Sequence, residues 1–372
     1  MLITNAAAFT GAGFHSGLRV RLADGVIAQT GEALTAAPGE DVLDLGGDYL
    51  LPGLVDAHIH GVMGHDAMRG EADVRAMSRS LRALGVAAFC PTTMSAPDAE
   101  TAAALAGIRA VMLRPEPDGA RVIGAHLEAP YLSAAHPGAQ DARWLRDPDW
   151  AHFLALCGGD TAAVRTVTMA PERAGSEAFI RGAAARGIRV SVGHSDADAE
   201  TLHRAGDWGA TRVTHTFNAQ TPLHHRAPGI PGAALTDDRF YCEMIADGIH
   251  LHPDTVRLIA RCKGDRAVAV TDAMEAAGLP DGRYTLGGQA VTVSGGAARL
   301  ADGTLAGSVL TLPEALENLI RRFGIDPARA CAMVTRNPAD SLGEPLLGRL
   351  VPGSPVPLTR WSPDWRFVSP VA

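Results

Sequence analysis

Leu54-Val55-Asp56-Ala57-His58-Ile59-His60 places two imidazoles two residues apart at the end of an apolar run. In a β-strand, alternate residues point to the same side, so His58 and His60 could offer nitrogens to one divalent ion. A single His-x-His pair is weak support for a metal site, because histidines in strands are often only hydrogen-bonded core residues. The pair therefore predicts half of a metal site, and the other half has to come from elsewhere in the chain.

Short apolar runs rich in Val, Ile, Ala and Thr recur between Gly85 and Met274, separated by stretches of helical composition. This alternation predicts βα units and a parallel sheet. The runs that follow the strand ending at His58 are Val86 to Thr92, Val122 to Leu127, Val164 to Met169, Ile188 to Val192, Thr211 to Thr214, Tyr241 to Ala246 and Ala267 to Val270. The expected helices include residues 73–84, 97–111, 176–186, 198–205 and 253–262. Eight strands favour a closed (β/α)8 TIM-like barrel over an open doubly wound sheet, for which the Gly-rich dinucleotide fingerprint is missing.

The two ends of the chain have a different pattern. Residues 1–48 contain short alternating segments broken by Gly and Asp, and residues 345–372 repeat this style with several prolines. Both segments predict strands of one small β-sandwich domain, formed by the N- and C-terminal parts around a catalytic barrel at 49–344. The Gly-rich segment 282–307 predicts hairpin strands inserted after the eighth barrel strand.

The composition restricts the class of protein. The 372 residues carry a net charge of −8, with 47% hydrophobic and 20% charged residues, as in ordinary globular proteins. No run of Lys or Arg could neutralise a phosphate backbone, so we expect no nucleic-acid partner. No basic and apolar leader and no stretch of ~18 apolar residues is present, so we expect neither export nor a membrane partner. Five scattered cysteines without Cys-x-x-Cys spacing indicate reduced thiols and a cytoplasmic protein.

Potential ligands follow several other strands, at the carboxyl ends where barrel enzymes carry their catalytic side chains. They are Glu128 after the third strand, His194 after the fifth, His215 after the sixth and Asp272 after the eighth. Each alone could be a helix cap or a hydrogen-bonded histidine, but together with the first-strand pair they predict a metal site. The donor set suits a divalent metal at one or two ions per chain, with zinc first and iron, manganese or cobalt as alternatives.

Such a site supports hydrolysis. A divalent ion held by neutral imidazoles and a carboxylate lowers the pKa of bound water to roughly 7. A carboxylate that is not a ligand can take the proton of the water and return it to the leaving group, and Asp272 is the candidate for this catalytic role. Covalent catalysis is a poor competitor, because the chain has no Gly-x-Ser-x-Gly elbow and no cysteine in a nucleophile motif.

Further motifs extend the pattern over nearly the whole chain. They are 52–61 (PGLVDAHIHG), 126–128 (HLE), 193–195 (GHS), 215–226 (HTFNAQTPLHHR), 245–250 (IADGIH), 270–273 (VTDA) and 302–308 (DGTLAGS). On these residues the sequence resembles the amidohydrolase superfamily, and more narrowly the N-acetylglucosamine-6-phosphate deacetylase family. The resemblance implies hydrolysis of N-acetyl-D-glucosamine 6-phosphate to D-glucosamine 6-phosphate and acetate, in amino-sugar catabolism and cell-wall recycling, by a homodimer.

The resemblance also implies roles for individual residues. It implies that Glu128, His194 and His215 hold the main metal and that Asp272 is the general acid and base. The substrate contacts that it implies are Ala139, Gln140, Asn218, Ala219, Arg226, Asp247, His250, Leu305, Ala306, Gly307 and Ser308. For a phosphomonoester in an acidic protein, Arg226 offers two parallel donors that a lysine could not. We treat His224 and His225 as structural and assign no role to His65, His136, His203 or His252.

Some features depart from that family. Some of its members replace one or both first-strand histidines and use a single metal, whereas this chain keeps both, so we expect two ions bridged by Glu128. Many members carry a histidine where Gln140 stands, and a methionine is common where Gln220 stands. Gln140 can donate a hydrogen bond but cannot carry charge, so we hypothesise that the second metal takes over part of the polarisation of the amide carbonyl.

Two alternatives stay open from the sequence. One is the same chemistry on N-acetylgalactosamine 6-phosphate or on another N-acylated amine, because one sequence does not resolve the configuration of a hydroxyl. The other is a non-catalytic metal-binding scaffold of the same fold, which we expect to lack a ligand or the acid/base group. No such residue is missing from this chain.

Overall fold

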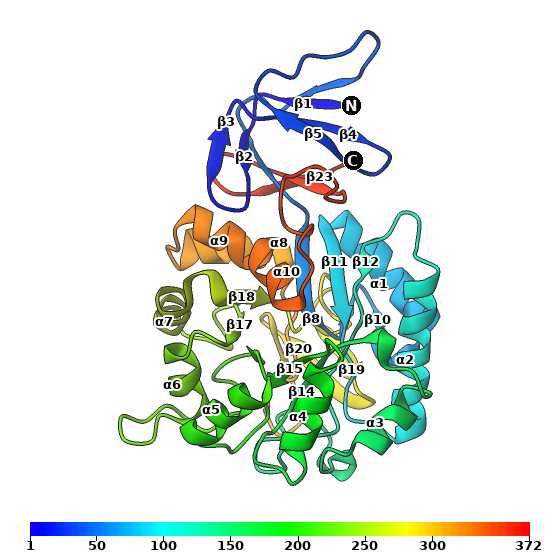
Figure 1. Cartoon of the computed structure of the whole chain (residues 1–372), viewed down its shortest axis with the longest axis vertical. Helices are drawn as coiled ribbons and strands as arrows, with labels where there is room; N and C mark the ends of the chain where they lie inside the picture. The colour runs from blue at the N-terminus through cyan, green and yellow to red at the C-terminus, as the bar shows by residue number, and fades with distance from the viewer.

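Eight parallel strands form a closed barrel in the computed structural model, which describes all of residues 1–372 (Figure 1). The strands are β8 (Leu54–Ile59), β11 (Val86–Pro91), β13 (Ala125–Leu127) with the short β12 (Arg121–Val122) before it, β14 (Val164–Met169), β15 (Arg189–Val192), β16 (Arg212–Val213), β17 (Tyr241–Ile245) and β18 (Ala267–Val270). Backbone bonds beyond the strand ends close the barrel, since Asp272 N donates to His58 O at 2.9 Å and Thr93 N donates to His126 O at 3.0 Å. The predicted (β/α)8 TIM-like barrel is confirmed.

Helices connect the strands and surround the barrel (Figure 1). They are α1 (Glu71–Ala83), α2 (Asp98–Leu113), α3 (Trp150–Leu156), α4 (Ser176–Ala184), α5 (Ala199–Trp208), α6 (Gly229–Thr236), α7 (Pro253–Lys263), α8 (Leu312–Glu317), α9 (Pro327–Val334) and α10 (Arg336–Leu342). The helices expected from the sequence are present, with ends displaced by a few residues. The short α3 and α6 were not among them, nor were α8, α9 and α10 near the carboxyl end. Helix α6 contains Gly229, Pro231 and Gly232, which are poor helix formers.

The N- and C-terminal segments form a small β-sandwich, and both chain ends lie in it (Figure 1). One sheet has the order β5 (Val26–Gly31), β4 (Arg19–Ala23), β1 (Leu2–Thr4), β6 (Val42–Asp44), and the other has the order β23 (Phe367–Val371), β22 (Leu358–Trp361), β7 (Tyr49–Leu51), β2 (Ala7–Phe9), β3 (Phe14–Ser16). Side chains of both sheets, among them Ile3, Leu50 and Leu358, pack into their own apolar cluster. Because β7 pairs with β2 and β22, the chain enters the barrel after Leu51, slightly later than the expected limit at residue 48.

A three-stranded antiparallel sheet follows β18. Its strands are β19 (Gly282–Leu286), β20 (Gln289–Ser294) and β21 (Ala297–Arg299). Leu286 packs with Met94 and Met274 of the barrel loops in a separate apolar cluster. Gln289 Nε2 donates to Ala139 O at 2.6 Å and ties the inserted sheet to the loop after β13. The insertion therefore forms a wall beside the carboxyl ends of the strands.

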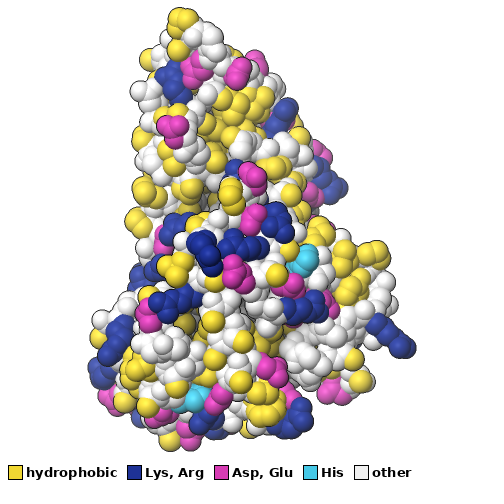
Figure 2. Space-filling model, turned by 90° about the vertical axis from the view of Figure 1, so that its right-hand side faces the viewer, with side chains coloured by type: hydrophobic (Ala, Val, Ile, Leu, Met, Phe, Trp, Pro, Cys, Tyr) yellow, Lys and Arg dark blue, Asp and Glu magenta, His cyan; other side chains and the backbone are white.

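Charged side chains of both signs lie next to one another on the face shown in Figure 2. On α1, Arg75 and Arg79 both pair with Glu116, with N–O distances of 3.5 and 3.1 Å. Exposed pairs of this kind contribute only ~0–1 kcal/mol each, so packing of the apolar clusters carries most of the stability. No helix of the protein combines the length and the apolar character needed to cross a bilayer.

Gly53 lies where the chain passes from the small domain into β8, and we expect its substitution to destabilise the protein. A Cβ at this position would collide with the Pro357 carbonyl oxygen and the Ala87 Cβ. Gly53→Ala should lower the free energy of unfolding by about 1–3 kcal/mol, because a backbone carbonyl cannot swing aside as a flexible side chain can. Chemical denaturation measures this change. Gly13→Ala is the matched control, since a Cβ there has no neighbour within 4 Å, and equal losses in both variants would contradict the prediction.

Candidate metal centre and active site

Three of the candidate ligands stand at strand ends in the left-handed backbone conformation. Their φ angles are 48° at His194, 28° at His215 and 48° at Asp272. This conformation costs a non-glycine residue about 1–3 kcal/mol. Bonds from neighbouring strands hold the backbone there, since His215 N donates to Glu243 Oε2 at 3.2 Å and Asp272 N donates to His58 O at 2.9 Å. The barrel thus fixes the backbone from which each ligand projects.

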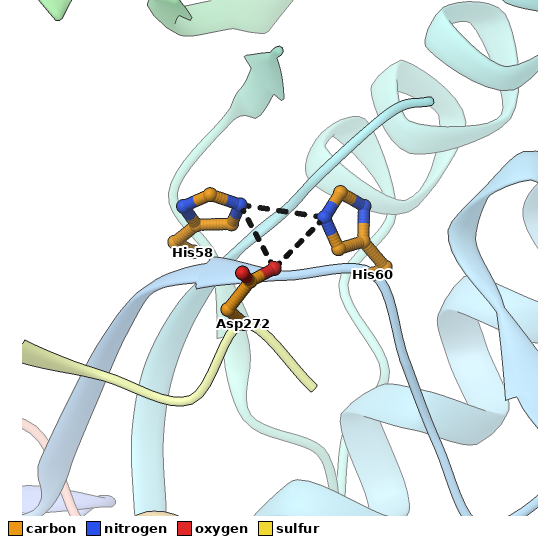
Figure 3. Close-up of side chains that lie close together, drawn as sticks. All are labelled: His58, His60 and Asp272. Atoms are coloured by element: carbon orange, nitrogen blue, oxygen red, sulfur yellow. Dashed lines mark hydrogen bonds and ion pairs between the residues drawn. The ribbon is translucent and has the colours of Figure 1, made fainter. Parts of the chain in front are cut away.

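His58, His60 and Asp272 form the first of two side-chain triads (Figure 3). The two Nε2 atoms are 3.3 Å apart, and Asp272 Oδ1 lies 3.3 Å from His58 Nε2 and 3.1 Å from His60 Nε2. The two imidazoles come from alternate positions of one segment, as the sequence predicted. None of the three side chains is more than 10% exposed.

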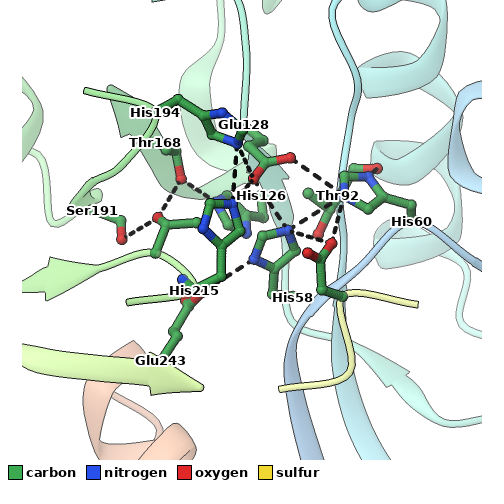
Figure 4. A network of polar contacts seen from close by, with 12 residues as sticks. His58, His60, Thr92, His126, Glu128, Thr168, Ser191, His194, His215 and Glu243 are labelled. Carbon is green, nitrogen blue, oxygen red and sulfur yellow. Dashed lines mark hydrogen bonds and ion pairs between the residues drawn. The ribbon is translucent and has the colours of Figure 1, made fainter. Parts of the chain in front are cut away.

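Glu128, His194 and His215 form the second triad. Glu128 Oε1 lies 3.4 Å from His194 Nε2 and 3.1 Å from His215 Nε2. The same carboxylate reaches the first triad, with Oε1 at 3.4 Å from His58 Nε2 and Oε2 at 3.3 Å from His60 Nε2. In Figure 4 it stands between the two histidine pairs. The arrangement can hold two divalent ions with Glu128 between them.

The carboxylates of the centre control the protonation of its imidazoles. Burial lowers the pKa of His60, but hydrogen bonds to Asp272 and Glu128 outweigh burial and raise the pKa to about 9. Burial likewise lowers the pKa of His58, and the charges of Asp272 and Glu128 raise it well above its usual value. Burial raises the pKa of Glu128, whereas the surrounding histidines hold it well below its usual value. A divalent cation would satisfy the same carboxylates in place of these protons, so the residues present fit a metal ion.

A buried ion pair orients the His58 ring through its Nδ1 atom. His58 Nδ1 donates to Glu243 Oε2 at 3.1 Å, and Arg212 NH2 donates to Glu243 Oε1 at 2.6 Å. Both charged side chains are fully buried, and Arg212 also donates to Ser341 Oγ of α10. Such contacts fix which ring nitrogen faces a metal. Neither residue is predicted from the sequence, although Glu243 is a charged residue within the apolar run Tyr241–Ile245, which is a usable signal.

Backbone carbonyls orient two further candidate ligands. His60 Nδ1 donates to Thr92 O at 3.2 Å, and His194 Nδ1 donates to His136 O at 3.0 Å. The sequence assigns no role to His136, but its carbonyl contact with His194 and its position in the wall of the adjoining cavity place it in the site. The local sequence around His136 gives no sign of this contact.

A cavity of about 370 Å³ adjoins the two triads. The predicted substrate contacts that line it are Ala139, Gln140, Asn218, Ala219, His250, Leu305 and Gly307. The centre contributes His60, Glu128, His194, His215 and Asp272 to its wall. Asp247 stands behind the wall, where it accepts a hydrogen bond from His250 Nδ1 at 2.7 Å. Ala306 and Ser308 are buried instead, and Ser308 Oγ donates to Thr271 O at 2.6 Å.

Arg226 lies away from the cavity of its own chain. Residues 222–228 are all exposed, and they form part of the loop that projects beside α5 and α6 in Figure 1. Arg226 NH1 contacts His225 Nε2 at 2.6 Å, and Arg226 does not line the cavity. The structure therefore does not bring the predicted phosphate contact to the other substrate-site residues, because the loop between β16 and α6 points outward.

Comparison with known proteins agrees with this geometry. The model of the Amidohydrolase family matches residues 49–371. The chain belongs to the amidohydrolase family. It is 40% identical over 339 residues to an N-acetylgalactosamine-6-phosphate deacetylase of Escherichia coli O157:H7, covering 90% of this chain and 88% of that protein. It is also 40% identical over 333 residues to an N-acetylglucosamine-6-phosphate deacetylase of Vibrio furnissii, covering 87% and 82%.

Solved structures share the whole architecture. An N-acetylglucosamine-6-phosphate deacetylase from Pasteurella multocida superposes with a TM-score of 0.93 at 26% identity, covering 100% of this chain and 97% of that one. A mutant N-acetyl-D-glucosamine-6-phosphate deacetylase from Mycobacterium smegmatis, in complex with N-acetyl-D-glucosamine-6-phosphate, superposes with a TM-score of 0.92 at 32% identity, with the same coverage. The resemblance expected from the motifs is confirmed.

In this amidohydrolase, Gln140 is engaged with the candidate metal centre. Its Nε2 donates to Glu128 Oε2 at 2.8 Å and also faces Met94 Sδ at 3.6 Å. Its Oε1 accepts from Ser95 N at 2.7 Å, and the side chain is buried. Because both ends of the amide are occupied, the geometry favours orientation of the Glu128 carboxylate over the predicted hydrogen bond to substrate.

Gln220 braces the turn that follows His215. Its Nε2 donates to Thr214 O at 2.8 Å, and its Oε1 accepts from Phe217 N at 3.2 Å. The turn needs this support because Phe217 and Ala219 have φ angles of 81° and 49°. A methionine at this position could not form either bond, so the departure from the common family residue has a structural use.

We expect Gln140→Leu to weaken metal binding, because Glu128 Oε2 loses a buried hydrogen-bond donor. Loss of such an outer contact typically lowers metal affinity by about 10- to 100-fold. Metal content per chain after dialysis against graded chelator concentrations measures the effect. Gln289→Leu is the matched control, since Gln289 contacts the same loop at Ala139 O but not Glu128. Equal metal retention in the two variants would contradict the role of Gln140.

Proposed function

We propose that this amidohydrolase converts N-acetyl-D-glucosamine 6-phosphate and water to D-glucosamine 6-phosphate and acetate, a reaction of amino-sugar catabolism and cell-wall recycling. The observation that carries the proposal is the Glu128 carboxylate between two histidine pairs at the wall of a cavity of about 370 Å³. The relatives at 40% identity are named as deacetylases of two hexosamine 6-phosphates, which supports a phosphorylated amino sugar as substrate.

Two divalent ions fit the proposed reaction. His58 and His60 would hold one ion, and His194 and His215 the other, with Glu128 shared between them. Such ions make water nucleophilic near neutral pH and polarise the amide carbonyl. Imidazole and carboxylate ligands suit zinc, which we propose, and also iron, manganese or cobalt.

Asp272 is the proposed general base and acid. It lines the cavity, and its Oδ1 lies 3.1 Å from His60 Nε2. Burial raises the pKa of Asp272, but the charges of His58 and His60 hold it below its usual value, so the group is a carboxylate at neutral pH. A carboxylate there can accept a proton from the attacking water and pass it to the amine nitrogen as the C–N bond breaks.

The remaining cavity wall supplies contacts for the sugar. Asn218 offers an amide at the wall, and Ala139 and Leu305 offer apolar surface. The Asp247 carboxylate accepts from His250 Nδ1, which leaves His250 Nε2 for the substrate. These residues support recognition of a ligand that is polar over most of its surface and carries one small apolar acetyl group.

Arg226 completes, in our proposal, the phosphate site of the partner subunit in a homodimer. Its loop is exposed and projects from the barrel, and Leu223 on the same loop is 45% exposed. A phosphate dianion in a chain with a net charge of −8 requires a local cation, and a guanidinium gives two parallel hydrogen bonds to it. Because Arg226 does not line the cavity of its own chain, its loop is available to contact the site of a second subunit.

A second candidate substrate is N-acetylgalactosamine 6-phosphate. The relative named for this epimer is 40% identical to the chain, as is the Vibrio furnissii relative named for the glucosamine epimer.

For the location of the protein we propose the cytoplasm, because all five cysteines are free.

The zinc-loaded protein should release acetate from N-acetylglucosamine 6-phosphate with kcat/KM about 10- to 100-fold above that for the unphosphorylated sugar, the usual value of charge-assisted hydrogen bonds. Asp272→Asn should lower kcat by about 10²- to 10⁴-fold, as expected for loss of a general acid and base. Asp238→Asn, on the exposed surface, is the control. Preference for the galactosamine epimer would select the second candidate, and full activity of Asp272→Asn would contradict the proposed mechanism.

Two defective variants test whether Arg226 acts across the dimer. Arg226→Ala keeps Asp272, and Asp272→Asn keeps Arg226. Only a hybrid dimer, in which Arg226 of one chain reaches the site that contains Asp272 of the other, therefore has a complete site. Co-expression of both chains should restore about a quarter of the wild-type activity, since half of the dimers are hybrids with one complete site each. A mixture no more active than the average of the two variants would show that Arg226 does not act in the partner.

A further inference from the structure

A π-helix from Asn318 to Arg322 continues α8 and contacts the loop after β17. Asn318 Nδ2 donates to Ala246 O at 3.0 Å. Arg322 NH1 donates to Asp247 O at 2.7 Å, and its NH2 lies 3.4 Å from Gly248 O. Two side chains of one short π-helix thus bind three consecutive carbonyls of the loop. Segments of π-helix are rare and occur often at functional sites.

The loop held in this way carries a histidine of the cavity wall. Asp247 Oδ1 accepts from the backbone N of Ile249 at 2.8 Å and of His250 at 2.9 Å, and its Oδ2 accepts from His250 Nδ1 at 2.7 Å. The side chains of Asp247 and His250 are only 9% and 7% exposed. The direction of the His250 ring therefore depends on the backbone of residues 246–248, which is the part that the π-helix binds.

Gly248 shows that the loop is shaped around the guanidinium. Its φ is 73°, and a Cβ at this position would collide with the Arg322 guanidinium carbon and nitrogens. Any other residue would therefore meet both an unfavourable backbone conformation and the Arg322 side chain. The close approach of Arg322 to the backbone at Gly248 depends on the missing Cβ.

Ion pairing does not explain the placement of Arg322. No carboxylate lies within 4.0 Å of its nitrogens, although Glu317 lines the same groove. Glu317 pairs instead with Arg321 at 3.9 Å and with Arg366 at 2.6 Å. Arg322 instead directs its donors to the loop carbonyls. This choice of partners indicates a function in holding the loop.

We propose that Arg322 is a positioning residue, which holds residues 246–248 so that Asp247 presents the His250 ring to the substrate in the cavity. The proposal rests on the proposed function in one respect, namely that His250 contacts the sugar phosphate. Arg322 itself touches no substrate, because it lines a separate groove on the other side of the loop. Its effect on the reaction passes through His250.

The test is a double-mutant cycle in the zinc-loaded enzyme. Arg322→Met should raise the KM for N-acetylglucosamine 6-phosphate about tenfold, with kcat changed less than about twofold, as for loss of a binding contact. Arg322→Lys keeps the charge but places its donors on one nitrogen in place of the guanidinium fork, so it should recover part of this loss. Adding Arg322→Met to His250→Gln should raise KM no further than His250→Gln alone. Arg321→Met, on the same π-helix, is the matched control and should leave KM unchanged.

Histidine ring spectra separate failure of this proposal from failure of the proposed function. In ¹H–¹⁵N correlation spectra, the ring signals of His250 are those lost in His250→Gln, and they should shift in Arg322→Met but not in Arg321→Met. An unshifted His250 ring, or independent effects of the two substitutions on KM, would overturn the positioning role. A wild-type enzyme inactive on every hexosamine phosphate, with the ring still shifted in Arg322→Met, would refute the proposed function and leave the loop contact supported.

Discussion

The buried carboxylate of Glu128 is the constraint on which the rest of the site depends. It is 1% exposed, and a charge removed from water is tolerated only where partners compensate it. Imidazoles from the ends of three strands, β8, β15 and β16, converge on its two oxygens, and Gln140 adds a neutral donor. The barrel must close in one register for these groups to meet, so the charge of the centre and the geometry of the sheet depend on each other.

Beneath this centre, the barrel interior contains one buried ion pair and two further buried ionisable groups. Arg212 and Glu243 neutralise each other and fix the ring of His58. Burial raises the pKa of Asp56 to about 6, while a hydrogen bond from Thr271 Oγ1 at 2.6 Å opposes this shift. Burial lowers the pKa of His126, beside His58, to about 3, so this ring stays neutral. The imidazoles that contact the carboxylates of the centre are therefore the ones that carry positive charge, whereas His126 does not.

The cavity is built from segments that are far apart in the chain. The loop after β13 brings Gln140, the turn after β16 brings Asn218, and the segment after the inserted sheet brings Leu305. Contacts such as that of Gln289 with Ala139 O join these segments to one another. Bonds of the sheet hold the candidate metal centre at the strand ends, whereas the proposed recognition residues stand on segments joined by loop-to-loop contacts. The residues proposed for the chemistry and those proposed for selectivity thus lie on different parts of the fold.

The sequence by itself determined the barrel, the placement of the candidate ligands at strand ends and the family, because alternation of strands and helices, the spacing of His58 and His60, and the motif runs are local patterns. It did not indicate the short helix α6, whose glycines and proline are tolerated through packing against neighbours. The engagement of Gln140 with Glu128, the Arg212–Glu243 pair and the outward course of the Arg226 loop were decided only by the tertiary structure. Each depends on contacts between residues distant in sequence, and no local pattern encodes which distant groups will share a buried charge.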